Sequence, residues 1–185
     1  MSVVERKARD RAQRERLIIT AARELAESDG WDAVTTRRLA ERIEYSQPVL
    51  YSHFAGKDAI VTAVALDGFT ELAAALAAQD PDAGLAGVAQ AYLAFADANP
   101  ALYDAMFTMR IDLPFGQRDT PAPLQAGFVA IRDALVSGDR DADELAALAE
   151  LVWSALHGIV TLHRTGRLPA ESQAQRMALL VSVFG

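Results

Sequence analysis

Residues 35–57 read TTRRLAERIEYSQPVLYSHFAGK, and this stretch decides the expected fold. It predicts two short helices joined by a tight turn, with a third helix beginning just after Lys57. This is the layout of a helix-turn-helix, in which the first helix braces the DNA backbone and the second enters the major groove. The stretch therefore predicts a protein that binds duplex DNA.

The apolar residues of this stretch fall at helical spacing. In the second helix, Leu50 and Phe54 lie four residues apart and are expected to point inward, which leaves Gln47 and Tyr51 outside. The first helix has an N-terminal cap at Thr35 or Thr36. Its apolar side is formed by Val34, Leu39, Ala40 and Ile43.

Several outward side chains suit contacts with DNA. Gln47 can read the edge of an adenine, and Val49 can touch the methyl group of a thymine. Pro48 fits the first turn of the second helix, where its missing N–H costs nothing. Side chains that can reach phosphate oxygens are Thr36, Tyr51, His53 and Lys57.

At these residues the chain resembles the tetracycline-repressor (TetR) family of bacterial regulators. The matching motifs are Thr35-Thr36-Arg37-Arg38-Leu39-Ala40, then Ser46-Gln47-Pro48-Val49-Leu50-Tyr51-Ser52-His53-Phe54, then Lys57. The resemblance is specific over residues 12–60 and architectural beyond them. The motif and the resemblance together predict these DNA-binding residues: Thr36, Arg37, Ser46, Gln47, Pro48, Val49, Tyr51, His53 and Lys57.

The turn departs from the pattern of the family that it resembles. Most members have Leu-Gly-Val there, whereas this chain has Ile43-Glu44-Tyr45. A left-handed conformation, which the glycine would adopt easily, costs about 1–2 kcal/mol at Glu44. Glu44 also brings a carboxylate close to the expected path of the DNA, so the geometry of this turn is a point for the structure to settle.

Charge is divided unevenly along the chain. The net charge is −7, but residues 1–57 hold 11 Lys and Arg against 9 Asp and Glu, whereas residues 58–185 hold 7 against 16. The end expected to meet phosphate is therefore positive and the remainder acidic. The first ten or so residues are expected to form a flexible arm that touches DNA. Their cationic neighbourhood comprises Arg6, Lys7, Arg9, Arg11, Arg14 and Arg16.

The composition excludes several classes of protein. With no cysteine, the chain has no disulfide, no thiol nucleophile and no thiolate metal site. It has no uncharged apolar run of about 18 residues and no apolar core typical of a signal peptide, so we expect a cytoplasmic protein that does not span a membrane. It has no Gly-rich phosphate loop, no metal-ligand spacing and no supported nucleophile–base pair. We therefore expect no enzyme, no cofactor and no metal.

The periodicity predicts an all-α fold of about nine helices. A three-helix DNA-binding head and its arm occupy residues 1–57, and a helical ligand-binding and dimerisation domain occupies residues 58–185. A proline-rich loop is expected at residues 113–123. The first helix is expected from about residue 11 to Ser28, followed by Gly30 as a stop and Trp31 as a hydrophobic anchor. Its expected buried stripe consists of Leu17, Ile18, Ala21, Ala22 and Leu25. The later helices are expected at residues 58–78, 85–98, 101–110, 124–137, 142–165 and 170–184.

Residues 151–160 are apolar nearly all round, which is typical of a helix that is buried on every side. One side can pack on its own core and the other on a second copy, although a purely intramolecular core helix fits too. The Trp153-x-x-x-His157-Gly158 pattern resembles one TetR subgroup, which implies a homodimer through the helices at 142–165 and 170–184. Paired heads also suit a two-fold operator.

A small, largely apolar effector would bind among the middle helices, although core packing is the better explanation for each candidate side chain. The candidates are Phe69, Tyr103, Met106, Phe107, Arg110, Phe128, Trp153 and His157. The leading hypothesis is a ligand-responsive dimeric repressor that binds double-stranded operator DNA. The alternative is a helical small-molecule-binding or scaffolding protein whose head binds no DNA, which Glu44 and the acidic body favour.

Overall fold

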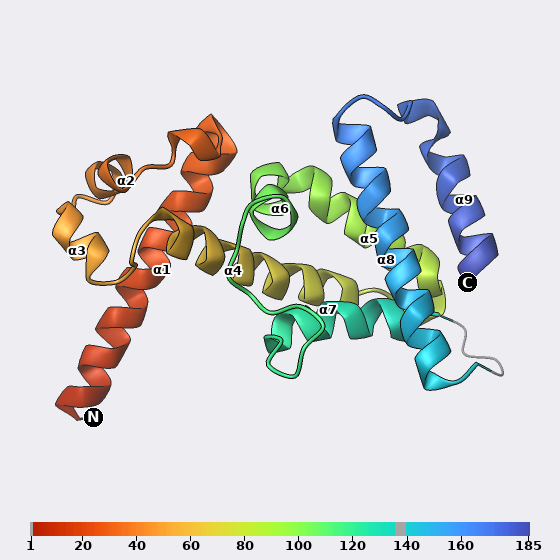
Figure 1. Cartoon of the computed structure of the whole chain (residues 1–185), viewed down its shortest axis with the longest axis horizontal. Helices are drawn as coiled ribbons and strands as arrows, with labels where there is room; N and C mark the ends of the chain where they lie inside the picture. Colours follow the sequence, from red (N-terminus) through yellow and green to blue (C-terminus); the bar gives the residue numbers. More distant parts are fainter. Residues whose placement is uncertain (1, 136–139) are drawn as a thin grey trace. The chain divides into compact units, whose positions relative to one another are not determined.

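The computed structural model describes residues 2–135 and 140–185, and in this part of the chain every regular element is a helix (Figure 1). Nine α-helices and three short 3-10 turns make up the described secondary structure, which confirms the all-α prediction. The chain folds into two compact units. The first runs from the N-terminus to Gly68 and includes Asn99–Pro114, and the second comprises Phe69–Ala98 and Phe115–Gly185.

The first unit contains the predicted head. Its elements are α1 (Val3–Asp29), the 3-10 turn η1 (Trp31–Ala33), α2 (Thr36–Arg42), α3 (Gln47–Tyr51), the first half of α4 (Lys57–Ala77) and α6 (Pro100–Phe107). Residues of the predicted apolar stripes meet in its core, where Ile18, Leu39 and Leu50 are each almost fully buried. Leu17 of the predicted stripe is 43% exposed instead. Thr35 is the N-cap of α2, with its side chain accepting a hydrogen bond from the Arg38 N–H at 3.2 Å.

The flexible arm predicted for the first ten residues is wrong, because α1 begins at Val3. The helix has a capping box: the Ser2 hydroxyl accepts a hydrogen bond from the Glu5 N–H, and the Glu5 carboxylate accepts one from the Ser2 N–H. Two otherwise unpaired backbone donors are satisfied in this way. The Ser2-Val3-Val4-Glu5 pattern is readable in the sequence as a helix start.

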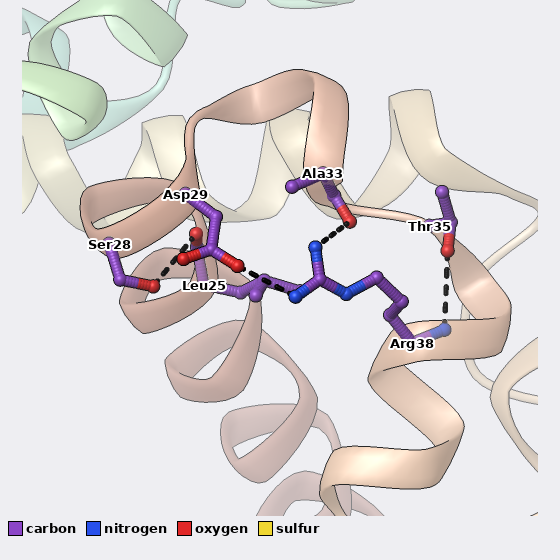
Figure 2. Close-up of polar contacts among 6 residues, drawn as sticks. All are labelled: Leu25, Ser28, Asp29, Ala33, Thr35 and Arg38. Carbon is purple, nitrogen blue, oxygen red and sulfur yellow. Dashed lines mark hydrogen bonds and ion pairs between the residues drawn. The ribbon is translucent and has the colours of Figure 1, made fainter.

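Arg38 of α2 joins three segments of the first unit (Figure 2). Its guanidinium lies 2.6 Å from a carboxylate oxygen of Asp29, the last residue of α1, and donates to the carbonyl of Ala33 in η1. The hydrogen bond from Arg38 lowers the pKa of Asp29 below its ordinary value, with a further contribution from Ser28. Both side chains of the pair are more than 40% exposed, so the ion pair orients α2 more than it stabilises the fold.

α6 is held against the end of α1 by polar contacts. Both carboxylate oxygens of Glu27 accept hydrogen bonds from the N–H groups of Ala101 and Leu102, at 3.0 and 2.9 Å. These donors belong to the first turn of α6, so Glu27 acts as a cap supplied by another helix. The Trp31 indole N–H donates to the carbonyl of Ala101 at 2.7 Å, which ties η1 to the first turn of α6.

The second unit contains the rest of α4, η2 (Pro81–Ala83), α5 (Gly84–Ala98), α7 (Ala122–Asp133), α8 (Ala142–Arg164), η3 (Ala170–Ser172) and α9 (Gln173–Phe184). α5 packs against α7, α8 and α9, and α7 against α8. Helix ends differ from the prediction by a few residues. α7 begins two residues earlier than expected and is helical to Asp133, while positions 136 and 137 lie outside the described residues. The last helix starts with a 3-10 turn at 170–172 rather than as α-helix.

α8 is buried on one side only. Val152 and Leu156 are fully buried, whereas Leu151 is 57% and Leu162 40% exposed. α4 and α8 are long and apolar enough to cross a membrane by length and composition, with 50% and 22% of the relevant window buried in the chain. Core helices of globular proteins meet the same criterion, so this is weak support for a membrane span. The low burial of α8 instead defines an apolar surface that the single chain leaves uncovered.

Candidate nucleic-acid interface

The turn between α2 and α3 is closed by backbone hydrogen bonds. The Tyr45 N–H donates to the carbonyl of Ala40 at 2.9 Å, and the Glu44 N–H donates to that of Glu41 at 3.4 Å. These two bonds form a Schellman motif, which requires a left-handed residue at the position of Glu44. Glu44 has φ 58°, and it is the one residue other than glycine with positive φ in the described part of the chain. The expected left-handed turn therefore forms despite the missing glycine.

α3 presents a short polar face to solvent. It begins after Ser46, which has extended backbone, and carries Pro48 in its first turn as predicted. Leu50 is 1% exposed and fixes the inner side of the helix, while Gln47, Pro48 and Tyr51 are exposed. Val49 is half-buried beside them. The residues predicted to read bases thus lie on the outer side of α3.

Two of the predicted DNA-binding residues, Thr36 and Arg37, lie on the neighbouring α2. The Thr36 hydroxyl is 3.5 Å from the Tyr51 hydroxyl, so the two helices present adjacent polar groups. The Arg37 side chain is 78% exposed and pairs with Glu41 at 2.9 Å. Such an exposed pair costs little to open, which leaves the Arg37 guanidinium available to a phosphate.

His53 and Lys57 point their polar atoms toward the chain itself. The His53 side chain is 6% exposed, and its Nδ1 lies 3.4 Å from a carboxylate oxygen of Glu15 in α1. The Lys57 ammonium group donates to the carbonyl of Trp31. The sequence reasoning missed Glu15 and the carbonyl as partners, because neither lies near its partner in the sequence. Both contacts tie the segment after α3 to the rest of the first unit.

The predicted effector residues are divided between the two units. In the first, Tyr103 and Met106 are 1% exposed, and the Tyr103 and Phe107 rings have centroids 4.7 Å apart. Arg110 is exposed after the end of α6. In the second unit, Phe69 is 6% exposed and its ring meets the edge of Phe115 at 5.7 Å, a partner that the sequence reasoning did not include. The half-buried members of the predicted set are Phe107 in the first unit and Phe128, Trp153 and His157 in the second.

His157 is the predicted effector residue whose protonation the fold changes most clearly. Burial lowers the pKa of His157 below its ordinary value, because the charged imidazole loses solvation. The ring Nε2 lies 3.5 Å from the Thr161 hydroxyl, one turn along α8. Within residues 2–135 and 140–185, no three His, Asp or Glu side chains gather in a way that could hold a metal ion.

Two family descriptions match this chain. One, "Bacterial regulatory proteins, tetR family", covers residues 18–64, and the other, "Tetracyclin repressor-like, C-terminal domain", covers residues 85–183. The uncharacterized HTH-type transcriptional regulator YobS of Bacillus subtilis (strain 168) is 32% identical over 95 residues, 49% of this chain and 50% of that protein. Tetracycline repressor protein class C of Escherichia coli is 48% identical over 56 residues, 30% of this chain and 25% of that protein. The chain thus spans half the length or less of these two relatives.

Solved structures of similar fold cover nearly the whole chain. SCO4313, described only provisionally as a regulatory protein, superposes with a TM-score of 0.74 at 25% identity, over 95% of this chain and 98% of that one. A TetR variant from Acinetobacter baumannii AYE in complex with minocycline superposes with a TM-score of 0.65 at 23% identity, over 89% and 90%. Because the C-terminal family description alone matches more than half of the residues, the chain belongs to the TetR family of helix-turn-helix transcriptional regulators.

Proposed function

We propose that this regulator is a repressor that binds a two-fold operator as a homodimer and leaves it when a small effector binds. The observation that carries the DNA-binding part is the exposed polar side of α3 on a closed Schellman turn. Gln47 would read an adenine edge and Val49 a thymine methyl group. Phosphate contacts would come from Thr36, Arg37, Ser46 and Tyr51. Like other regulators that act on bacterial promoters, the protein would work in the cytoplasm.

His53 and Lys57 remain in the proposed DNA-binding site, although in the free chain their polar atoms contact the protein itself. In the free chain their polar atoms are engaged with Glu15 and with the Trp31 carbonyl. A direct contact with phosphate would require these bonds to open, whereas their present contacts hold α3 at a fixed angle to α1. We therefore assign them first to positioning of the reading helix, with phosphate binding as the additional role predicted from the motif.

Dimerisation is supported by the apolar surface of α8 and α9. Four large apolar side chains on these helices are between 40% and 65% exposed: Leu151, Leu162, Leu179 and Val183. Exposed apolar area of this kind in a soluble regulator is typical of a protein–protein interface. A second copy packed through the same surface would give the isologous contact that two-fold symmetry requires.

Effector control is supported by the continuity of α4 and by a structural neighbour. α4 begins in the DNA-reading unit and ends in the second unit, so this single helix is one of the segments that connect the two units. The neighbour of similar fold binds minocycline. An apolar effector that favoured a different position of α4 by several kcal/mol would release the operator. The candidate residues in the second unit are Phe69, Phe128, Trp153 and His157.

Selection of random duplex DNA by the purified protein, followed by sequencing of the retained DNA, tests the proposed function. We expect an enriched inverted repeat, because each head reads one half-site. On that operator, Tyr51→Ala should weaken binding by about tenfold at unchanged folded-state circular dichroism, through loss of a phosphate contact. A folded protein that enriches no sequence at low salt would contradict the proposal. It would favour the helical ligand-binding or scaffolding protein, with Glu44 as the first residue to revert to glycine.

A further inference from the structure

The N-terminal part of α1 is an exposed helical extension of the head. Every residue from Ser2 to Arg14 is exposed, so no other part of the described chain covers it. The end of the helix-turn-helix touches α1 at Glu15, through His53. From Glu15 back to Val3, a helix that rises about 1.5 Å per residue extends about 18 Å. Figure 1 shows these turns running past α3 to the N-terminus.

The side of α1 that forms the core changes character along this extension. Ile18 and Leu25 lie on that side and are buried in the first unit. Continued toward the N-terminus at spacings of four, three and four residues, the same side carries Arg14, Arg11 and Lys7. Apolar residues thus give way to cations where the helix leaves the head. This set, Lys7, Arg11 and Arg14, is called the inner stripe below.

The cations of the inner stripe are exposed and mostly unneutralised. Arg11 pairs with Glu15 at 2.8 Å and remains 56% exposed. No ion pair to Lys7 or Arg14 forms among the residues that the structure describes. The helix also bears Arg9 and Arg16, likewise exposed, but on the side opposite the stripe.

We propose that the inner stripe binds phosphates of operator DNA outside the base pairs that α3 reads. This inference rests on the proposed DNA-binding function and extends it to a second contact surface. Duplex DNA carries one negative charge per about 1.7 Å of axis, so an 18 Å cationic helix matches the phosphates of about five base pairs. Glu15, at the base of the extension, contacts His53 in the segment that follows α3, so the extension leaves the head next to the reading helix.

Other acidic partners fit this surface less well. An acidic protein or a second copy of the acidic C-terminal half would supply negative charge, but not at the regular spacing that a rigid helix with cations on one side can follow. The helix is capped and therefore ordered before binding, which lowers the entropic cost of the contact. A duplex beyond the half-site is the partner closest to the stripe.

The test compares two charge-matched variants of the full chain on the operator recovered by selection. In the inner variant, Lys7→Gln is combined with Arg14→Gln, and in the outer variant, Arg9→Gln is combined with Arg16→Gln. Binding is measured at salt concentrations from about 50 to 200 mM. Because each released phosphate contact removes about 0.9 from the slope of log K against log salt, the inner variant should lose about 1.8. Between about 50 and 200 mM salt, the factor by which the inner variant loses affinity should be about tenfold smaller than the factor for the parent.

A second measurement uses an operator shortened by about five base pairs on each flank, the length matched to the extension. The parent should bind the short operator about tenfold more weakly than the long one, and the inner variant, which keeps only Arg11 of the stripe, should lose most of this difference. Equal salt slopes for parent and inner variant would overturn the proposal, as would equal losses in the inner and outer variants. If the folded parent bound no duplex at all, the proposed function itself would fail, which is a distinct result.

Discussion

At the scale of single residues, Glu44 has a backbone conformation that a residue with a Cβ atom disfavours. Its φ of 58° lies in the region that L-amino acids avoid, while the Schellman hydrogen bonds from Glu44 and Tyr45 hold it there. The cost of this conformation is about 1–2 kcal/mol for a residue with a Cβ atom. Glycine would remove that cost, but it loses more backbone freedom on folding, which destabilises the folded state by about 0.5–1 kcal/mol.

Glu44→Gly is therefore expected to stabilise the protein by about 0.5–1 kcal/mol. In thermal unfolding this corresponds to a rise in midpoint of about 2–4 °C for each kcal/mol in a chain of this size. Glu44→Gln is the matched control, because it keeps the left-handed cost and removes only the charge. We expect its unfolding midpoint to equal that of the parent. A midpoint that fell in the glycine variant would show that the carboxylate makes a stabilising contact.

His157 gives the folded state a dependence on pH. Burial lowers the pKa of His157 in the folded chain, so the unfolded chain takes up this proton at a higher pH than the folded chain does. The stabilising effect of a neutral His157 is complete above the ordinary pKa of about 6.5 and is lost as pH falls below it. The free energy of unfolding should thus decrease between pH 7.5 and pH 5.5. In urea titrations at several pH values, the free energy of unfolding of His157→Gln should fall less steeply with decreasing pH, by up to the slope that one bound proton gives. A variant with the same pH dependence as the parent would contradict this account.

At the scale of helices, sequence predicted the elements better than their ends. The stripe of Leu25 and Ile18 predicted the buried part of α1, because burial and 3.6-residue periodicity go together. The extension to Val3 lacks an apolar stripe, and it was missed because its start is encoded in the capping box of Ser2 and Glu5 instead. A helix that packs against no other element needs no apolar face, so hydrophobic periodicity cannot reveal it.

The predicted site shows the same division. The outer side of α3 followed from the inward spacing of Leu50, so Gln47 and Tyr51 lie in solvent as expected. The partners of His53 and Lys57 come from α1 and η1, segments distant in the sequence, and spacing within one helix could not reveal them. For the same reason, no local pattern indicated that α6 would fold with the head, held by Glu27 and Trp31.

Gly68 allows α4 and α6 to approach closely within the first unit. A Cβ atom at this position would lie 2.7 Å from the Met106 sulfur and 2.8 Å from a Leu102 methyl carbon. Both side chains are almost fully buried, so neither can move away without strain. Gly68→Ala is therefore expected to destabilise the protein by about 1–3 kcal/mol, measured by urea unfolding.

The control for this prediction is Gly127→Ala in α7. A Cβ atom at Gly127 would meet nothing within 4 Å, and its backbone is helical. Alanine is the better helix former by about 1 kcal/mol, so this variant should gain stability. Opposite signs for two identical substitutions would attribute the loss at Gly68 to the α4–α6 contact. A Gly68 variant as stable as the parent would show that the contact can relax.

At the scale of the whole molecule, the acidic charge of residues 58–185 and the apolar surface of α8 and α9 act in opposite ways. The negative charge disfavours DNA, while the apolar surface favours a second chain, and with it a second positively charged head. In the proposed dimer, two heads would bind two half-sites, and the second contact would form at a high effective concentration. A regulator with an acidic body can then hold DNA through its heads alone, provided that it is dimeric.

Leu151→Glu combined with Leu179→Glu tests this requirement. The two leucines are 57% and 58% exposed in the single chain, so the changes should leave its fold intact while placing charge in the proposed interface. In sedimentation at micromolar concentration, the parent should have twice the chain mass of 19.9 kDa and the variant that mass itself. Affinity for the two-half-site operator should fall about a hundredfold, because the effective concentration of the second head is lost.

Val129→Glu, at an exposed position of α7, should remain dimeric with full affinity. A double variant that stayed dimeric would place the interface on a different surface, whereas a monomer with undiminished affinity would show that one head is enough.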